Sequence, residues 1–424
     1  MAVVGAAIAA VEPGACLRAP LSRLRSAIDQ ASAWHVVAAG KAAGAMMRAC
    51  LASIGRRPAS ALCASPGHVD GLPAWIRQFA GGHPTPNDQS AAAGRAALDV
   101  AAAAGPDDLL VVLLSGGASA LFALPVPGVS LVDKQATTDR LLRAGATIHA
   151  LNSVRKHLSA VKGGRLAAST RARTVCLAIS DVVGDDPSVI GSGPAVGDPT
   201  TYADALRSLD AHGGRAGFPA SVVQTLEAGL RGELAETPKP ASAELRRSET
   251  HVIASQRDAV RGAQTEARAR GYEVHLHEAP IVGEARDAAI AHAAALRLLC
   301  DTVASSFCVV SAGETTVRVT GQGLGGRNQE FALALVEPLA RWPRAAVAVS
   351  VGTDGIDGPT SAAGAIIDST SLERALESDL IPARYLAAND AYHFFRPLGD
   401  LVVMGPTGTN VGDVQVVVVA NRRP

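Results

Sequence analysis

Residues 109–114 read LLVVLL, and residues 115–119 directly after them read SGGAS. A continuous apolar run of this length predicts a strand buried on both faces, as in a parallel sheet covered by helices. Similar short runs at residues 35–39, 61–64 and 175–179 are separated by segments with helical composition. This alternation predicts an α/β fold whose N-terminal domain is Rossmann-like, with a mostly parallel sheet and helices on both faces.

A second set of strands follows residues 231–247, a segment with two prolines, mixed charge and no periodicity. Such a segment is typical of a domain linker. The later strands are short and closely spaced, for example residues 315–320 and 414–419, and this spacing predicts a mixed sheet. We therefore expect two domains, residues 1–236 and residues 237–424.

The composition excludes several functional classes. The chain has 424 residues, its 39 Lys and Arg balance its 39 Asp and Glu, and only 3% of its residues are aromatic. A neutral, aromatic-poor surface does not suit nucleic acid. No apolar run reaches the length of a membrane span, and residues 1–13 predict an amphipathic first helix. Six cysteines without CxxC spacing indicate buried thiols, and we expect a cytoplasmic protein.

Polar residues gather where the predicted strands end, which is where open α/β sheets bind ligands. Lys41 follows the strand at residues 35–39 and is one of only five lysines among 39 basic residues. This scarcity favours a functional lysine over a solvated surface one. The loop is not a Walker A sequence, because position 35 is His where that pattern needs Gly. The SGGAS segment predicts an anion nest, with a plain small-residue turn as the alternative; its candidates are Ser115, Gly116, Gly117 and Ser119.

Acidic and amide side chains occupy other predicted strand ends. Asp181 follows the strand at residues 175–179 and is a candidate Mg²⁺ ligand, with a turn or cap as the alternative. Glu314 lies in a GET segment that we expect to be a loop. Asp354 lies in a glycine loop and is a candidate metal ligand or general base. Asn410 lies in a polar turn between two strands and completes this set.

Residues 321–330 read GQGLGGRNQE and formally match the dinucleotide pattern GxGxxG. The preceding strand alternates, and no acidic residue ends a strand about 20 residues later, so the match is poor. We interpret the segment, including Gly325 and Gly326, as a phosphate-cradling loop with Arg327 as phosphate binder. A glycine loop beside a surface arginine is the alternative. Anion nests and carboxylates without a nucleophile–base pair favour phosphoryl transfer.

Eight ordered blocks of the chain together resemble the glycerate 2-kinase family with a C-terminal MOFRL domain, some members of which are named hydroxypyruvate reductase. The blocks are GKAAGAMM, GGHPTPND, LLSGGASALFALP, LNSVRKHLSAVKGGRLA, ISDVVGDDPSVIGSGPAVGDPTTY, AGETTVRVTGQGLGGRNQEFALA, GTDGIDGPTSAAGAIID and NDAYHFF with GPTGTNVGDVQV.

The resemblance implies two α/β domains, the second with a mixed sheet and a MOFRL region at about residues 306–420, and an active site in the cleft between them. It implies ATP- and Mg²⁺-dependent phosphorylation of D-glycerate at the 2-hydroxyl, which gives 2-phospho-D-glycerate and ADP. Lys41 and Arg327 would be a catalytic pair, with Glu314 and Asp354 beside them. Substrate and cofactor would contact the SGGAS loop, the 325–326 glycines, Asn152, Arg155, Lys156 and Asn410.

Two other functions stay open at this point. One is reduction of hydroxypyruvate by NAD(P)H, which the poor dinucleotide pattern disfavours. The other is non-catalytic binding of a small phosphorylated acid, which the intact Lys, Arg and carboxylate loops disfavour. A homodimer is one candidate assembly, and the sequence leaves the oligomeric state open.

Overall fold

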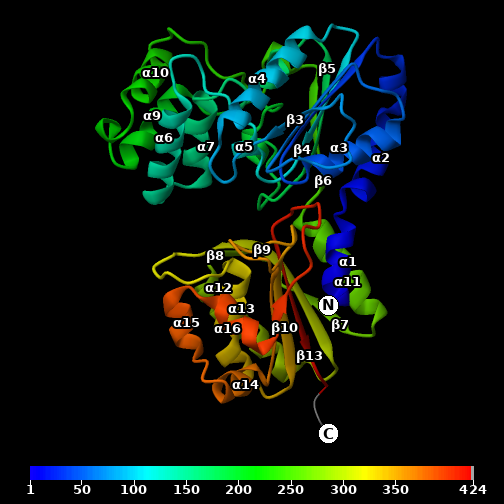
Figure 1. The fold of residues 1–424 in the computed structure, drawn as a ribbon, viewed down its shortest axis with the longest axis vertical. Helices are drawn as coiled ribbons and strands as arrows, with labels where there is room; N and C mark the ends of the chain where they lie inside the picture. Colours follow the sequence, from blue (N-terminus) through cyan, green and yellow to red (C-terminus); the bar gives the residue numbers. More distant parts are fainter. Residues whose placement is uncertain (422–424) are drawn as a thin grey trace. The chain divides into compact units, whose positions relative to one another are not determined.

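A computed structural model of the protein describes residues 1–421, which divide into two compact units (Figure 1). The first unit comprises residues 13–253. The second comprises residues 1–12 together with the chain from residue 254 onward.

The first unit is built on a six-stranded sheet in the order β3-β2-β1-β4-β5-β6. The paired strands from β3 to β5 are all parallel, and β6 lies beside β5. This is the strand order of a Rossmann-type sheet, so the predicted fold class is confirmed. The strands are β1 (Trp34–Ala39), β2 (Ser60–Ser65), β3 (Arg77–Ala80), β4 (Leu109–Leu114), β5 (Arg173–Ile179) and β6 (Ser248–Ala254).

Helices cover both faces of this sheet because its central strands are apolar on both sides. Alternate residues of β1, β2 and β4 join one core with α4, while α2 and α3 pack together and α3 contacts β1, β2 and β4. The elements are α2 (Pro13–Gln30), α3 (Ala43–Ile54), α4 (Asp88–Ala103), α5 (Ala118–Leu121), α8 (Arg165–Ala168) and the short helices η1 (Ile190–Ser192) and η3 (Ala243–Leu245).

A group of helices with its own small core lies beside the sheet in the first unit (Figure 1). Tyr202, Leu206, Phe218 and Leu226 are among its buried residues. The group comprises α6 (Leu131–Arg143), α7 (Ile148–His157), α9 (Tyr202–Ala211), η2 (Arg215–Gly217) and α10 (Ala220–Leu230).

The direction of strand addition reverses between β1 and β4. The chain adds β2 and β3 on one side of β1 and then places β4 on its other side. Crevices at the carboxyl ends of such strands are the usual ligand sites in this architecture. Here those ends are Ala39 and Leu114, directly before the Lys41 and SGGAS segments.

The second unit has a seven-stranded mixed sheet in the order β12-β11-β10-β13-β9-β7, with β8 also paired to β9. β7 and β8 are parallel to β9, and the other pairs are antiparallel, which confirms the predicted mixed sheet. The strands are β7 (Glu273–Leu276), β8 (Ile281–Glu284), β9 (Phe307–Thr316), β10 (Ala346–Gly352), β11 (Gly364–Asp368), β12 (Leu401–Val402) and β13 (Asp413–Val419).

Helices lie on both faces of the second sheet as well (Figure 1). The core on one face is formed with α12 (Ala285–Thr302), α13 (Arg327–Ala340), α14 (Ser371–Glu377), α15 (Pro382–Ala388) and α16 (Ala391–Leu398). On the other face, α1 (Ala2–Ala10) packs against α11 (Gln256–Ala269). Gly262 permits this contact, because a Cβ there would lie 2.5 Å from the Cβ of Ala10.

The expected boundary between residues 236 and 237 is wrong, because the first unit extends to residue 253. The predicted linker at residues 231–247 is instead packed onto the first unit. Thr237 is 1% exposed and donates a hydrogen bond to Asp198, and Asp198 N donates to the carbonyl of Pro238. The prolines and mixed charge of residues 231–247 correctly predicted an irregular segment, but they did not predict that part of it is buried.

Two local expectations are also corrected. Residues 315–320 do not form a separate strand, because β9 continues through Glu314 to Thr316 and pairs there with β8. The first helix, α1, is not amphipathic: its sequence AVVGAAIAA carries no charged residue. Residues 2–30, which contain α1 and α2, are long and apolar enough to cross a membrane by composition alone, and a buried core helix meets the same criterion.

Candidate active site

Lys41 lies in the turn between β1 and α3, against the SGGAS loop. Its backbone N–H donates to the carbonyl of Gly116 at 2.8 Å, and the next amide, of Ala42, donates to the Oγ of Ser115 at 3.0 Å. Gly40 has φ +131°, and a Cβ there would lie 2.1 Å from the Ser115 Oγ. The two loops therefore touch, as expected, and only glycine fits at their contact.

His83 joins this pair of loops, and sequence reasoning did not single it out as a site residue. A Cβ on Gly117 would lie 2.9 Å from the His83 ring and 3.3 Å from the Cγ of Lys41. Gly117 has φ +82°, which also favours glycine. His83 is exposed and lies in the GGHPTPND block. Membership of that block was the only sequence feature that could have identified it as a site residue.

Ser119 begins a hydrogen-bonded chain that reaches Asn152. Its Oγ lies 2.7 Å from the Oγ of Ser192, which donates to the Oδ1 of Asn152 at 3.0 Å. The Nζ of Lys162 donates to the carbonyls of Ser119 at 2.9 Å and Gly191 at 3.3 Å. The predicted residues Ser119 and Asn152 are therefore brought together, with Ser192 and Lys162 as additional members.

Arg155 and Lys156 are neighbours on α7 with different surroundings. Arg155 is partly buried, and burial lowers the pKa of its guanidinium to about 10. Lys156 is buried and its Nζ lies 3.3 Å from Asp198, which also accepts hydrogen bonds from Thr200 and Thr237. Lys156 thus has a buried structural partner, and its role in ligand binding stays a prediction.

Asp181 follows β5 by two residues and is partly buried. Nearby, the Asp186 carboxylate accepts the Ser188 backbone N–H, so Asp186 stabilises a turn. Within residues 1–421, no three His, Cys, Asp or Glu side chains are grouped to hold a metal. Mg²⁺ commonly uses one or two carboxylates with water and phosphate oxygens, so a single Asp181 is compatible with it.

In the second unit, Arg327 is held between two carboxylates. Its Nη1 donates to the Oε1 of Glu314 at 2.8 Å, and its Nε lies 2.8 Å from the Oδ2 of Asp413. Burial alone would lower the pKa of Arg327, but Asp413 and Glu314 raise it above its ordinary value. Burial also raises the pKa of Asp413 to about 6, although Arg327 favours its charged form. Sequence reasoning found Arg327 and Glu314 but missed Asp413.

Asp357 fixes the start of α13, the helix that Arg327 begins. Its carboxylate accepts the backbone N–H groups of Asn328 and Gln329 at 3.0 and 2.9 Å, which caps the helix. Burial raises the pKa of Asp357, and these hydrogen bonds oppose the rise. A Cβ on Gly326 would lie 2.3 Å from the Asp357 carboxyl carbon. The glycine before Arg327 therefore serves close packing against Asp357.

The GQGLGG loop is tied to the segment between α15 and α16. The amides of Gly321, Gly323 and Leu324 donate to Asn389 Oδ1, Ala388 O and Asp390 Oδ1, respectively. These three amides are not available to cradle phosphate. A phosphate contact at Gly325 and Gly326 stays a prediction.

Asp354 and Asn410 lie in two loops that are bonded to each other. The Thr407 amide donates to the Asp354 carbonyl, and Thr353 shares hydrogen bonds with residues 411 and 412. These loops adjoin β13, whose first residue, Asp413, pairs with Gly352 of β10 and Gly313 of β9. The predicted residues Glu314, Arg327, Asp354 and Asn410 are thus brought to one edge of the second sheet.

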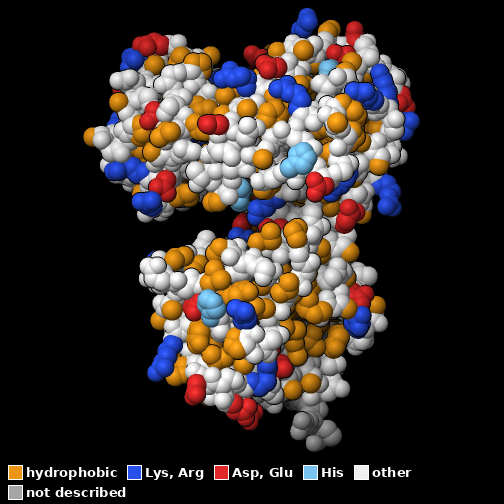
Figure 2. All heavy atoms as spheres, in the orientation of Figure 1, with side chains coloured by type: hydrophobic (Ala, Val, Ile, Leu, Met, Phe, Trp, Pro, Cys, Tyr) orange, Lys and Arg blue, Asp and Glu red, His pale blue; other side chains and the backbone are white. Residues whose placement is uncertain are grey.

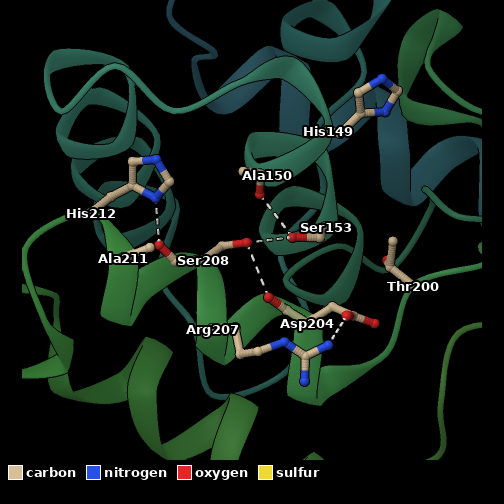
Figure 3. A pocket seen from close by; sticks show the side chains of 9 residues that line it. All are labelled: His149, Ala150, Ser153, Thr200, Asp204, Arg207, Ser208, Ala211 and His212. Atoms are coloured by element: carbon tan, nitrogen blue, oxygen red, sulfur yellow. Dashed lines mark hydrogen bonds and ion pairs between the residues drawn. The ribbon is translucent and has the colours of Figure 1, made fainter.

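A pocket of about 340 Å³ between α7 and α9 contains none of the predicted site residues (Figure 3). Its polar groups bond to one another: Ser153 Oγ lies 3.0 Å from Ser208 Oγ, and Arg207 pairs with Asp204. Charges of both signs alternate over the visible face of each unit, without a large basic surface (Figure 2). Neither this pocket nor the surface charge indicates a functional site other than the Lys41 and Arg327 residue sets.

Sequence and structure comparisons agree on the relatives of this chain. Residues 1–227 match the family described as Domain of unknown function (DUF4147), and residues 307–413 match the MOFRL family. A glycerate 2-kinase of Pyrococcus horikoshii is 37% identical over 352 residues, covering 82% of this chain and 79% of its own.

Two further comparisons involve Thermotoga maritima. Its D-glycerate 2-kinase is 35% identical over 417 residues, covering 97% of this chain and 95% of its own. The crystal structure of a glycerate kinase from this organism superimposes with a TM-score of 0.85 at 34% identity and covers 99% of this chain and 98% of that one.

Proposed function

The chain belongs to the glycerate 2-kinase family with a MOFRL domain, and from this premise we propose that it transfers the terminal phosphoryl group of ATP to the 2-hydroxyl of D-glycerate. Phosphorylation of glycerate with a nucleotide is the activity of its relatives, and it accounts for both residue sets.

The proposal rests on one residue set in each unit: the Lys41 loop at the topological switch point of the first sheet, and Arg327 held by two carboxylates in the second unit. In the proposed reaction, the glycerate 2-oxygen forms a bond to the γ-phosphorus as the bond to the bridging oxygen breaks and ADP leaves. Charge on the transferred oxygens is stabilised by Lys41 and Arg327, since positioning and charge carry phosphoryl transfer. The hydroxyl proton passes to a carboxylate, for which we propose Asp354.

Mg²⁺ would neutralise charge on the nucleotide phosphates, and Asp181 is the proposed protein ligand. A cytoplasmic location and a homodimer stay predictions. Reduction of hydroxypyruvate is not favoured, because three amides of the GQGLGG loop are already bonded within the second unit.

A coupled assay tests the proposal directly. ADP formation should depend on D-glycerate, and phosphorus NMR should identify the product as 2-phosphoglycerate. Under the same conditions, hydroxypyruvate should not consume NADH or NADPH. Reduction of hydroxypyruvate without any ADP formation from D-glycerate would overturn the proposal, and formation of 3-phosphoglycerate would overturn its regiochemistry.

A further inference from the structure

Three cationic side chains in the first unit act on one another without a carboxylate partner. They are Lys134 on α6, Arg155 on α7 and Lys162 in the turn that follows α7. Lys134 is 4% exposed and Lys162 is 0% exposed. The positive charges of Arg155 and Lys134 both repel the charged form of Lys162. Within residues 1–421, none of the three forms an ion pair with Asp or Glu. We call this group, together with Asn152, the cation cluster.

The contrast with Lys156 shows how unusual this arrangement is. Lys156 is equally buried, but the carboxylate of Asp198 lies 3.3 Å from its Nζ. The lysines of the cation cluster have only carbonyl acceptors: Leu158 O for Lys134, and Ser119 O and Gly191 O for Lys162. Burying ammonium groups without a counter-charge is costly, because carbonyl dipoles replace the lost hydration only in part.

The same cost lowers the pKa of both lysines. Burial, reinforced by Arg155, lowers the pKa of Lys134 to about 7. Burial also lowers the pKa of Lys162 well below its ordinary value, with Arg155 and Lys134 adding to the effect. An anion that entered the cluster would reverse both effects by supplying the missing charge.

A second, independent observation concerns Asn152 of the cluster. The Nδ2 of Asn152 is buried and has no hydrogen-bond partner, while its Oδ1 accepts from Ser192. Leaving a buried amide donor unpaired is destabilising. Ser192 contacts Ser119, whose carbonyl accepts from Lys162, so the unpaired donor and the unpaired charges belong to one network.

The cluster also has an accessible edge. Arg155 and Ser119 are only partly buried, whereas the two lysines and Asn152 are covered. Arg155 and Ser119 are therefore the members of this network that a solute can reach, and the two lysines are its covered members. The elements that meet here are connected, since α7 packs on α6 and η1, and η1 packs on α5.

We propose that the cation cluster binds the carboxylate of D-glycerate, with Arg155 as the direct donor and Asn152, Lys134 and Lys162 as buried groups that strengthen the site. This inference rests on the proposed function for the identity of the acid. The cluster would recognise any oxyanion, and a nucleotide phosphate is the alternative ligand to the carboxylate of D-glycerate. A carboxylate is favoured because a nucleotide phosphate arrives with Mg²⁺, which needs carboxylate ligands that this cluster lacks.

The test compares Lys134→Met and Lys162→Met with Arg143→Met, which removes one positive charge from the exposed side of α6. Binding of D-glycerate is measured by calorimetry without nucleotide, and KM is measured for D-glycerate and ATP separately. We expect the Kd for D-glycerate to rise about tenfold or more in Lys162→Met and severalfold in Lys134→Met. The KM for ATP should stay within about twofold, and Arg143→Met should match the unmodified protein.

Thermal unfolding separates this role from a structural one. Lys134→Met should keep or raise Tm, because it removes a buried charge that has no carboxylate partner, whereas Lys156→Met should lower Tm, because it removes the ammonium group that balances the buried carboxylate of Asp198. Lys134→Met keeps the test valid if Lys162→Met does not fold.

Unchanged D-glycerate affinity in the folded lysine variants would overturn the inference. A rise in the KM for ATP alone would assign the cluster to phosphate and overturn the carboxylate assignment. Failure of the unmodified protein to bind D-glycerate would also overturn it. Binding of D-glycerate that weakens in the variants, without ADP formation by the unmodified protein, would support the inference and refute only the proposed kinase activity.

Discussion

The guanidinium of Arg327 is anchored by a carboxylate with no exposed surface: its Nε lies 2.8 Å from the Oδ2 of Asp413, and the Asp413 side chain is 0% exposed. The opposite side of the same guanidinium donates to Glu314, which is 41% exposed. One contact therefore fixes the arginine to the sheet, while the other lies where solvent or a substrate can replace it.

This geometry predicts that Arg327→Lys loses most of its activity although it keeps its charge. A lysine cannot present donors to Asp413 and to a second group in one plane, so kcat should fall by about two orders of magnitude. Steady-state ADP formation measures the effect. Arg341→Lys, an exposed change just after the same helix, is the matched control, and an Arg327→Lys rate within about threefold of the unmodified protein would contradict the role.

Lys41→Met tests the residue at the switch point of the first sheet. Loss of its ammonium should lower kcat by about two orders of magnitude, because a charge near the transferred oxygens stabilises the transition state. Far-ultraviolet circular dichroism and Tm should match the unmodified protein. Arg48→Met removes a positive charge from the following helix and should retain full activity; near-normal turnover in Lys41→Met would remove that residue from the mechanism.

Activity should require a divalent cation, and Asp181→Asn should raise the Mg²⁺ concentration needed for half-maximal rate. One carboxylate ligand is compatible with Mg²⁺, which keeps several waters. Titration of Mg²⁺ after treatment with excess EDTA measures the requirement. Full turnover in EDTA would exclude the metal, whereas an unchanged Mg²⁺ titration in Asp181→Asn would exclude only this ligand.

His292 should make the second unit less stable in mild acid. Burial, with a smaller contribution from His277, lowers the pKa of His292 from 6.5 to about 4, and its Nδ1 is buried without a partner. The unfolded chain therefore takes up this proton at a higher pH than the folded one, so stability is present above pH 6.5 and is lost as the pH falls toward 4. The loss should reach about 2.5 kcal/mol by pH 4.5.

Urea unfolding at pH 7.0, 5.5 and 4.5 measures this loss. His292→Gln removes the titrating ring from the same position and should flatten the dependence, whatever its own stability at pH 7. An equal pH slope in the variant and the unmodified protein would show that other groups control acid unfolding.

The central strands of both sheets could be predicted because their apolarity is a local property of the sequence. Residues 109–114 form β4 with the bounds expected, and the Lys41 and SGGAS loops meet because the carboxyl ends of neighbouring parallel strands share an edge. In the second sheet, Glu314 and Asp354 reach one edge because β9 and β10 both pair antiparallel with β13, so that their carboxyl ends lie on the same side.

What could not be predicted depends on contacts between distant segments. Asp413 reaches Arg327 only because β13 pairs with β9 in a register that places it opposite Gly313. The lysines of the cation cluster come from separate segments, and nothing near either of them marks its burial. The domain boundary was misplaced for the same reason, since the packing of Thr237 against Asp198 has no local signature.

The position of α1 has a consequence for how the chain is made. This helix belongs to the second unit, and its partner α11 begins at residue 256. At a synthesis rate of about 5–20 residues per second, α1 leaves the ribosome on the order of 10–50 seconds before α11 exists. During that interval Val3, Val4 and Ala7 have no apolar surface of their own unit to cover them. This helix is thus completed long after it is synthesised, and its apolar sequence is a natural target for chaperones until then.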